Sequence, residues 1–409
     1  MHDRWLALVL LPLCLSLGAG AAEVKAKSGG VKRLGEEVVN RVDRVIQKKT
    51  FELWGDPWSM QGIPLLFPTG EDGFNTGLKV SMQNVLRQDP HKMEFEAQIL
   101  ASDKGRYKHF LKFDYPHAFG GRFRLTARVS YDRDITIRYF GVGNDNPVDK
   151  GLIDSGAPDY QYVRSSPTFY LQLLRRFGKH VRFGPILGLR WMDVTFPTGS
   201  LLDKQRPIGV NGGSTHYLAL ALQYDELDFE PYPSRGSLHE IFLAVHDRFT
   251  GSNYSYLRGT YTYRRYLLLH RKLIFAHRTL FEALSGGVPF YELGSVGGLN
   301  PSLVLGGDKY FRGFESNAFI DKIRLVMGVE LRWDPLFFLF AKQDITLGVV
   351  PFLDVGRVWP SIFPLNFGGW HASGGWGLRV IWDSRFVIRA DLALSSEGVA
   401  FVFNLGNSF

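Results

Sequence analysis

A glycine-rich stretch of the chain contains a single arginine. The stretch runs from 294 to 314 and ends Gly-Gly-Asp-Lys-Tyr-Phe-Arg-Gly-Phe, with Arg312 between bulky aromatic residues. It is too polar and too irregular for a strand. Small residues around one guanidinium suit a loop that folds back into a confined space and places a positive charge there. A turn on the surface is the simpler alternative.

The histidines of the chain do not form a recognisable catalytic arrangement. A hydrolase needs a nucleophile, a base and a group that orients the base, and no serine or acid stands at such a spacing from a histidine. The histidines considered are His109, His216, His239, His246 and His277. The glycine pairs at 141/143 and 306/307 are not followed by a helix, as a phosphate-binding loop requires. We therefore predict that the protein is not an enzyme and has no catalytic residues.

The N-terminus has the features of a secretory signal. Arg4 precedes an apolar run from 5 to 17, and small residues follow up to Ala22, near which we expect cleavage. The only cysteine, Cys14, lies inside that run, and the large Leu13 before it disfavours a lipoprotein. The mature chain then has no disulfide and no thiolate metal site, and we predict no metal and no cofactor.

A net charge of +8 without a basic run or a recognition helix predicts no nucleic-acid partner.

The segment 23–60 contains the one stretch with helical periodicity. Apolar residues recur there at three- and four-residue spacing between 31 and 49, with charged residues between them. This pattern predicts a short amphipathic helix in a periplasmic segment that is too short for a folded domain of ordinary size. No later run approaches the ~20 apolar residues that a membrane helix needs.

From residue 62 onward the hydrophobic period changes to two. Tyr107, Leu111 and Phe113 share one face of a strand whose other face carries Lys112 and Asp114, and the same alternation recurs down the chain. The predicted strands span 62–68, 73–86, 91–101, 105–115, 121–133, 160–177, 180–196, 215–226, 237–249, 254–267, 272–286, 321–333, 345–359, 372–383, 386–395 and 398–407. Sixteen is an even number, which leaves both chain ends on the same side.

Three features favour a membrane barrel over a soluble sandwich. The strands are long, arginines recur on the inner face, and aromatic residues such as Tyr256, Trp333 and Trp359 stand at strand ends, as interface girdles require. The longest connections, 134–159, 197–214 and 287–320, all follow odd strands and therefore share one side. We predict an all-β protein: residues 61–409 form a transmembrane β-barrel of about sixteen antiparallel strands, preceded by the signal peptide 1–22 and the segment 23–60.

The motifs in this predicted barrel resemble those of one family. Phe-Arg-Gly-Phe at 311–314 resembles the sixth-loop motif of the BamA/TamA surface-antigen superfamily of outer-membrane barrels, and the loop is the sixth external one in our count. Residues 350–359 resemble the Phe-x-Asp-x-Gly strand of that family, and 401–409 its last strand. Shorter likenesses lie at 139–144, 231–236 and 288–293. The resemblance covers about 60–409. The segment before it is too short for the periplasmic POTRA domains that the assembly members of the family carry.

The resemblance implies a structural lock in the lumen. In the family pattern Arg312 reaches down the lumen and pairs with Asp354, and Gly313 and Gly356 let the backbones approach closely beside Phe314. A bidentate carboxylate is the acceptor that a guanidinium in a barrel prefers. The lock would be structural and not catalytic.

The resemblance also implies a location and a function. It places the protein in the outer membrane of a Gram-negative bacterium, in contact with lipid, where it would aid insertion or translocation of a protein or lipid substrate with a periplasmic accessory protein. Pro64, Gly406 and Phe409 would form a weak seam between the first and last strands. A passive anion-preferring porin and an outer-membrane lipid-modifying enzyme are the alternatives.

Overall fold

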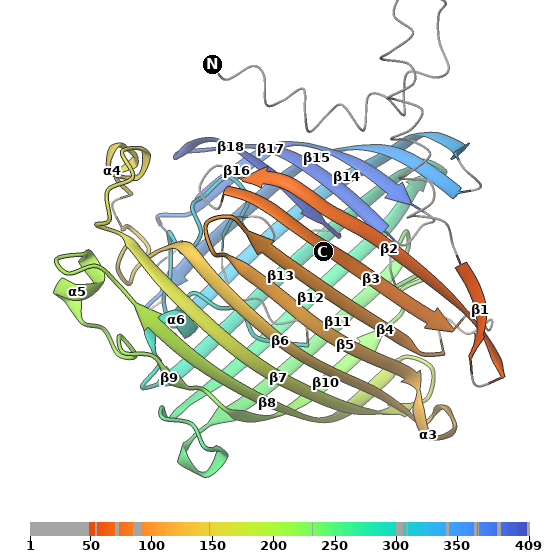
Figure 1. The fold of residues 1–409 in the computed structure, drawn as a ribbon, viewed down its shortest axis with the longest axis horizontal. Helices are drawn as coiled ribbons and strands as arrows, with labels where there is room; N and C mark the ends of the chain where they lie inside the picture. The colour runs from red at the N-terminus through yellow and green to blue at the C-terminus, as the bar shows by residue number, and fades with distance from the viewer. Residues whose placement is uncertain are drawn as a thin grey trace, which may run out of the picture.

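A single antiparallel sheet curls into a barrel in the computed structural model (Figure 1). The structure describes residues 49–53, 55–69, 73–84, 92–146, 148–230, 232–299, 306–307, 310–340, 343–363, 366, 368–382 and 386–406. The predicted signal peptide, the predicted helix before residue 49, and Phe409 lie outside the described residues.

Sixteen strands build the barrel wall, and each overlaps one of the sixteen predicted strands. They are β2 (Asp56–Thr69), β3 (Gly73–Asn84), β4 (Glu94–Ser102), β5 (Tyr107–His117), β6 (Phe123–Arg138), β7 (Gln161–Phe177), β8 (Val181–Thr195), β10 (Tyr217–Asp225), β11 (Gly236–His246), β12 (Tyr256–His270), β13 (Leu273–Gly286), β14 (Ile323–Phe340), β15 (Gln343–Trp359), β16 (His371–Trp382), β17 (Phe386–Ser395) and β18 (Gly398–Leu405). Each pairs antiparallel with the next, β8 pairing with β10. The predicted fold class is confirmed. Two short strands were not predicted: β1 (Lys49–Leu53), which pairs with β2, and β9 (Gly213–Ser214), which pairs with β8.

The two faces of each strand differ as the alternation predicts. On β5, Leu111 is 56% exposed whereas Asp114 is 1% exposed. On β14, Trp333 is exposed while Glu330 and Arg332 are buried. Large apolar side chains therefore cover the outside of the barrel, as a lipid-facing surface requires, and charged side chains point into the lumen.

Two strands extend beyond their predicted ends. β6 and β14 were predicted to stop at 133 and 333, but each continues past a shift in register, between Asp134 and Ile137 and between Trp333 and Leu336. A bulge inserts extra residues, so it breaks the alternation of side chains although the pairing of the backbone resumes. The first barrel strand also begins earlier than predicted, at Asp56.

The prediction of interface girdles was wrong for two aromatic residues. Tyr256 and Trp359 are 3% and 4% exposed, whereas Trp333 is half exposed. Tyr256 packs in an internal cluster with Leu284 and Phe290, and the Trp359 Nε1 group donates a hydrogen bond to the carbonyl of Asn366 at 2.8 Å. These residues face inward at the end of the barrel where loops fill the lumen.

The two ends of the barrel carry different connections. Short helices α4 (Lys150–Asp154) and α5 (Leu201–Gln205) lie in long connections at one end, called here the long-loop end, while β1 and α3 (Ala118–Gly121) lie at the other, the short-turn end (Figure 1). Outer-membrane barrels have short turns on the periplasmic side and long loops outside. None of the helices in the described residues is long and apolar enough to cross a membrane.

Candidate functional site in the barrel lumen

The described parts of the connection between β13 and β14, residues 287–299, 306–307 and 310–322, lie in the lumen and are called here the lumen loop. Its arginine, Arg312, is fully buried and binds Asp354 on β15. The Arg312 Nε and Nη2 groups donate to the two carboxylate oxygens of Asp354 at 2.8 and 3.0 Å, and its backbone N–H donates to the same carboxylate at 3.2 Å. The bidentate pair that the family resemblance implied is therefore present.

Two further carboxylates, which sequence reasoning missed, also face Arg312. Its Nη1 group donates to Glu330 on β14 at 2.7 Å and to Asp391 on β17 at 3.4 Å. The face of the guanidinium lies 3.6 Å from the ring centroid of Phe352, two residues before Asp354. The arginine is thus held by three strands and packed against an aromatic ring.

Three arginines of the barrel wall complete the network. Arg332 donates to Glu330 at 2.9 Å, Arg389 donates to Asp391 at 3.1 Å, and Arg379 donates to Asp391 as well. All of these side chains are nearly or fully buried. Burial of a charge costs several kcal/mol unless it is paired and hydrogen-bonded, so the guanidiniums and carboxylates on β14, β15, β16 and β17 depend on one another and on Arg312.

Glycines allow the tip of the lumen loop to lie against the wall. Gly313 has a φ of +87°, and a Cβ at this position would lie 3.1 Å from the Cβ of Ala393 and 3.4 Å from that of Ser373. The hydroxyl of Ser395 donates to the Gly313 carbonyl at 2.5 Å. A Cβ on Gly356 would lie 3.4 Å from the ring of Phe311. At Gly313 a side chain would therefore crowd the small residues of the wall, and at Gly356 it would meet the ring of Phe311.

The aromatic residues beside Arg312 form a buried cluster. The ring centroids of Phe311 and Phe314 are 4.5 Å apart, and Phe314 lies 5.2 Å from Phe319. The imidazole of His371, on β16, stacks on Phe319 at 3.7 Å. Phe314 thus belongs to the packing of the loop, and His371 takes part in that packing.

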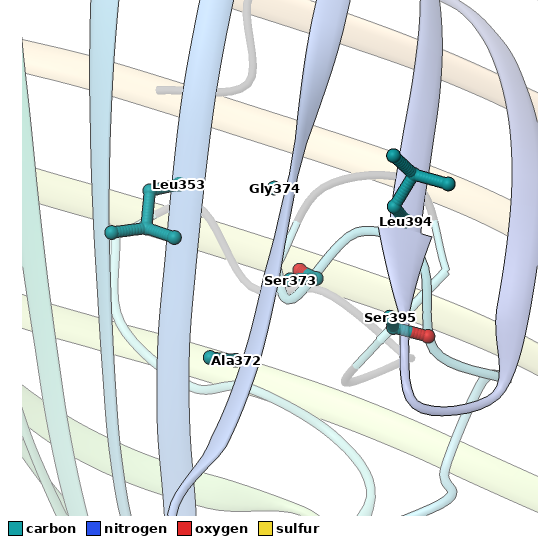
Figure 2. Close-up of a pocket in the computed structure, with 6 residues that line it drawn as sticks. All are labelled: Leu353, Ala372, Ser373, Gly374, Leu394 and Ser395. Carbon is teal, nitrogen blue, oxygen red and sulfur yellow. The ribbon is translucent and has the colours of Figure 1, made fainter.

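The barrel wall outside Gly313 is lined by small residues. A pocket of about 300 Å³ lies there, bounded by Leu353, Ala372, Ser373, Gly374, Leu394 and Ser395. Figure 2 shows Leu353 and Leu394 on either side of the β16 backbone at Ser373 and Gly374. The wall is therefore thin at the place where the loop tip packs against its inner face.

A second anchor holds the first half of the lumen loop, and sequence reasoning did not identify it. Glu292, in α6 (Phe290–Leu293), accepts hydrogen bonds from Arg190 on β8 at 2.8 Å and from Arg258 on β12 at 2.9 Å. Thr215 and Ser295 also donate to its carboxylate, at 3.0 and 2.8 Å. Burial raises the pKa of Glu292, but the two arginines outweigh burial and the pKa is lowered. The sequence signal that could have identified this anchor is an acidic residue next to two aromatic residues within 288–293.

The structure leaves the sheet open where the seam was predicted. In the part of the chain that the structure describes, no ladder pairs β18 with β2. The two strands lie side by side, because the ring centroids of Phe67 and Phe403 are 6.0 Å apart. Pro64 lies on the open edge strand with its side chain exposed, and it has no N–H to donate. Gly406 directly follows β18 and its N–H donates to the Val387 carbonyl of β17 at 2.6 Å.

Part of that edge is covered by the strand that precedes it. β1 pairs antiparallel with the start of β2, from Lys49 opposite Met60 to Leu53 opposite Asp56. The uncovered part of the β2 edge is therefore the part after Met60, which contains Pro64.

The histidines take part in packing contacts. His246 stacks on Tyr256 at a centroid distance of 3.9 Å, and His216 lies edge-on to Trp191 at 4.6 Å. In the described ranges, no group of three or more His, Cys, Asp or Glu residues could hold a metal ion.

The fold defines an integral membrane β-barrel with an apolar outer surface. The model of the Omp85 superfamily domain matches residues 102–409, and the chain belongs to that superfamily. This membership places the protein in the outer membrane of a Gram-negative bacterium. No curated protein sequence matches the chain.

Solved structures of two outer-membrane proteins are similar in fold. One is BamA from Haemophilus ducreyi lacking POTRA domains 1–3, with 14% identity, a TM-score of 0.51, and 95% of this chain and 80% of that chain covered. The other is CdiB from Escherichia coli, with 10% identity, a TM-score of 0.53, and 95% and 71% covered. At this identity the likeness concerns the fold.

Proposed function

We propose that the protein aids insertion or translocation of protein or lipid at the outer membrane. The observation that carries the proposal is the lumen loop, which is anchored by Arg312 in a barrel whose first and last strands are not paired. The Omp85 superfamily membership and the likeness to BamA and CdiB support it. The partners in this proposal are membrane lipid, the protein or lipid substrate, and a periplasmic accessory protein that handles the substrate.

The lumen network acts in this proposal as a structural lock. Arg312, Asp354, Gly313, Phe314 and Gly356 keep the lumen loop against the wall formed by β14 to β17 and do no chemistry. A passive anion-preferring porin is the weaker candidate. The inner-face arginines on which it was based donate to carboxylates, as Arg190, Arg258 and Arg332 do, so their charge is largely compensated.

Depletion of the protein tests the proposed function. Quantitative proteomics and lipid analysis of outer membranes after depletion should show the loss of a defined set of barrel or secreted proteins, or a change in one lipid class. Complementation with the wild-type chain should restore them, and complementation with an Arg206→Ala variant, changed at an exposed arginine of a long loop, should do so equally. Unchanged protein and lipid content after depletion would contradict the proposal.

A cross-link across the seam tests the lateral route. Phe67→Cys and Phe403→Cys place thiols on β2 and β18 at neighbouring side chains, and a reversible thiol cross-linker should then join the strands. We expect the cross-link to abolish complementation, and a reductant to restore it, because the substrate would pass between these strands into lipid. A matched pair on paired strands, Leu218→Cys with Val245→Cys, should leave complementation intact when cross-linked. Full complementation by the cross-linked seam would refute the lateral route.

A further inference from the structure

One turn at the short-turn end is much longer than its neighbours. The connection between β10 and β11 spans 226–235, whereas β7 and β8 are joined through 178–180, and β12 and β13 through 271–272. Internal hydrogen bonds shape this turn, since the Asp228 carboxylate accepts from the backbone N–H of Ser234 at 2.9 Å and from that of Phe229 at 3.0 Å. Pro233 further restricts its backbone.

The first side of the turn is bound to the wall three strands away. The Glu230 carboxylate accepts hydrogen bonds from the Arg124 Nη1 and Nη2 groups at 3.1 and 2.9 Å. Arg124, on β6, also donates to Asp114 of β5, at 3.0 and 2.8 Å. β10 reaches β6 only through β8 and β7. This contact therefore crosses part of the barrel mouth instead of following the wall.

The second side of the turn is bound three strands away in the other direction. The Tyr232 hydroxyl donates to the carboxylate of Asp334 on β14, at 3.1 and 3.2 Å. Between β11 and β14 the wall runs through β12 and β13. The Tyr232 ring also lies 5.6 Å from the guanidinium of Arg332, which belongs to the network around Arg312.

Apolar residues of the turn cover the inside of the wall between these two anchors. Leu227 and Tyr232 pack on Tyr266, Ile274 and Ala276 of β12 and β13. These three wall residues are no more than 5% exposed although they lie at an end of the barrel. The turn therefore lies within the mouth of the lumen and does not project out of the barrel.

A polar cavity lies next to the first anchor. It has a volume of about 210 Å³ and extends between the inner faces of β5 to β10 and Leu299 of the lumen loop. Its lining includes Lys112, Thr126 and Arg128, and the Thr126 hydroxyl donates to Asp114 at 2.8 Å, the carboxylate that also binds Arg124. The lumen loop bounds this cavity on one side, and the anchored turn lies beside it at the short-turn end.

We propose that residues 226–230 and 232–235 form a strap that closes the periplasmic mouth of the lumen, and that its release opens the polar cavity to ions and small hydrophilic solutes. The proposal goes beyond insertion or translocation, because it assigns a gate to the side of the barrel opposite the long loops. Two independent anchors, Glu230 to Arg124 and Tyr232 to Asp334, hold the strap across the mouth. Loss of both frees the strap while the wall ladders remain intact.

The conductance of the purified full chain in planar bilayers tests the strap. The double variant E230A/Y232F should show a several-fold higher single-channel conductance than the wild type, and liposomes that contain it should swell several-fold faster in a small sugar. Glu226→Ala removes a carboxylate of the same turn that accepts hydrogen bonds from the hydroxyls of Tyr224 and Ser237 beside it, so it should behave as the wild type. A heat-modifiable band in gel electrophoresis shows that each variant is folded. Wild-type conductance in a folded double variant would overturn the proposal.

A reversible cross-link tests the same strap without relying on lost contacts. In Glu230→Ala/Tyr232→Cys/Asp334→Cys, both anchors are absent until a reversible bifunctional thiol reagent replaces the second one. We expect raised conductance before cross-linking, wild-type conductance after it, and raised conductance again once a reductant cleaves the link. Equal conductance in the three states would overturn the proposal, whatever the outcome of depletion or of the seam cross-link.

Discussion

Replacing Arg312 with alanine is expected to abolish complementation and to destabilise the barrel more than any other single change in the lumen. Asp354 would then be a fully buried carboxylate that has lost all three of its hydrogen bonds to Arg312. Breaking a buried ion pair by removing one partner costs about 3–5 kcal/mol. The measurement is the free energy of unfolding in urea for the barrel in lipid vesicles, together with complementation of a depleted strain.

A second substitution separates stability from function. In Arg312→Ala/Asp354→Asn a neutral amide replaces the buried carboxylate. The double variant should therefore recover part of the lost free energy of unfolding. It should remain inactive, because the lumen loop is still not anchored to β15. Arg206→Ala is the control for loss of an arginine, since Arg206 is 57% exposed and pairs with Asp203 in its own turn. If the double variant complements the depleted strain, the lock is not required for function.

Replacing Glu292 with glutamine is expected to have the next largest effect. Arg190 and Arg258 would keep a hydrogen-bond acceptor but lose the carboxylate that compensates them, at a cost of about 3 kcal/mol. The effect should concentrate in the first half of the lumen loop, because this side chain joins α6 to both β8 and β12. We expect faster cleavage of the loop by external protease and a lower free energy of unfolding.

Glu315→Gln is the matched control in the same loop. Glu315 binds Arg138 at 2.9 Å, but its side chain is 30% exposed whereas that of Glu292 is 1% exposed, so water can solvate the substituted side chain and the cost should be smaller than for Glu292→Gln. Protease sensitivity of the two variants should therefore differ clearly. Equal protection of the loop in Glu292→Gln and the wild type would show that the Glu292 carboxylate is not needed to hold it.

The faces of the strands could be predicted because they depend on local sequence. Successive side chains of a strand point to opposite sides, so the alternation of Leu111 and Phe113 with Lys112 and Asp114 indicates which residues face lipid, and the structure has the same assignment. Where alternation failed, at Asp134 and Asp334, a bulge changed the face of the following residues.

The lumen loop was found from its composition and from a resemblance, and both depend on short motifs. Arg312 stands among glycines and aromatics, and Asp354 stands in a strand motif two strands later, so their pairing could be expected. The pairs formed by wall residues had no such motif. Glu330 and Arg332 were placed on one face of a strand by alternation, but nothing in the sequence placed Asp391 beside them.

The sequence by itself therefore determined where the sixteen wall strands lie, the inner and outer faces of their regular parts, and the loop that carries Arg312. The tertiary structure alone decided which charged side chains meet: Glu330 and Asp391 with Arg312, Glu292 with Arg190 and Arg258, and Glu230 with Arg124. The physical reason is that alternation fixes only the face on which a side chain lies. Its partner across the lumen depends on the stagger between strands and on the path of the loops, and no local pattern in the sequence contains either.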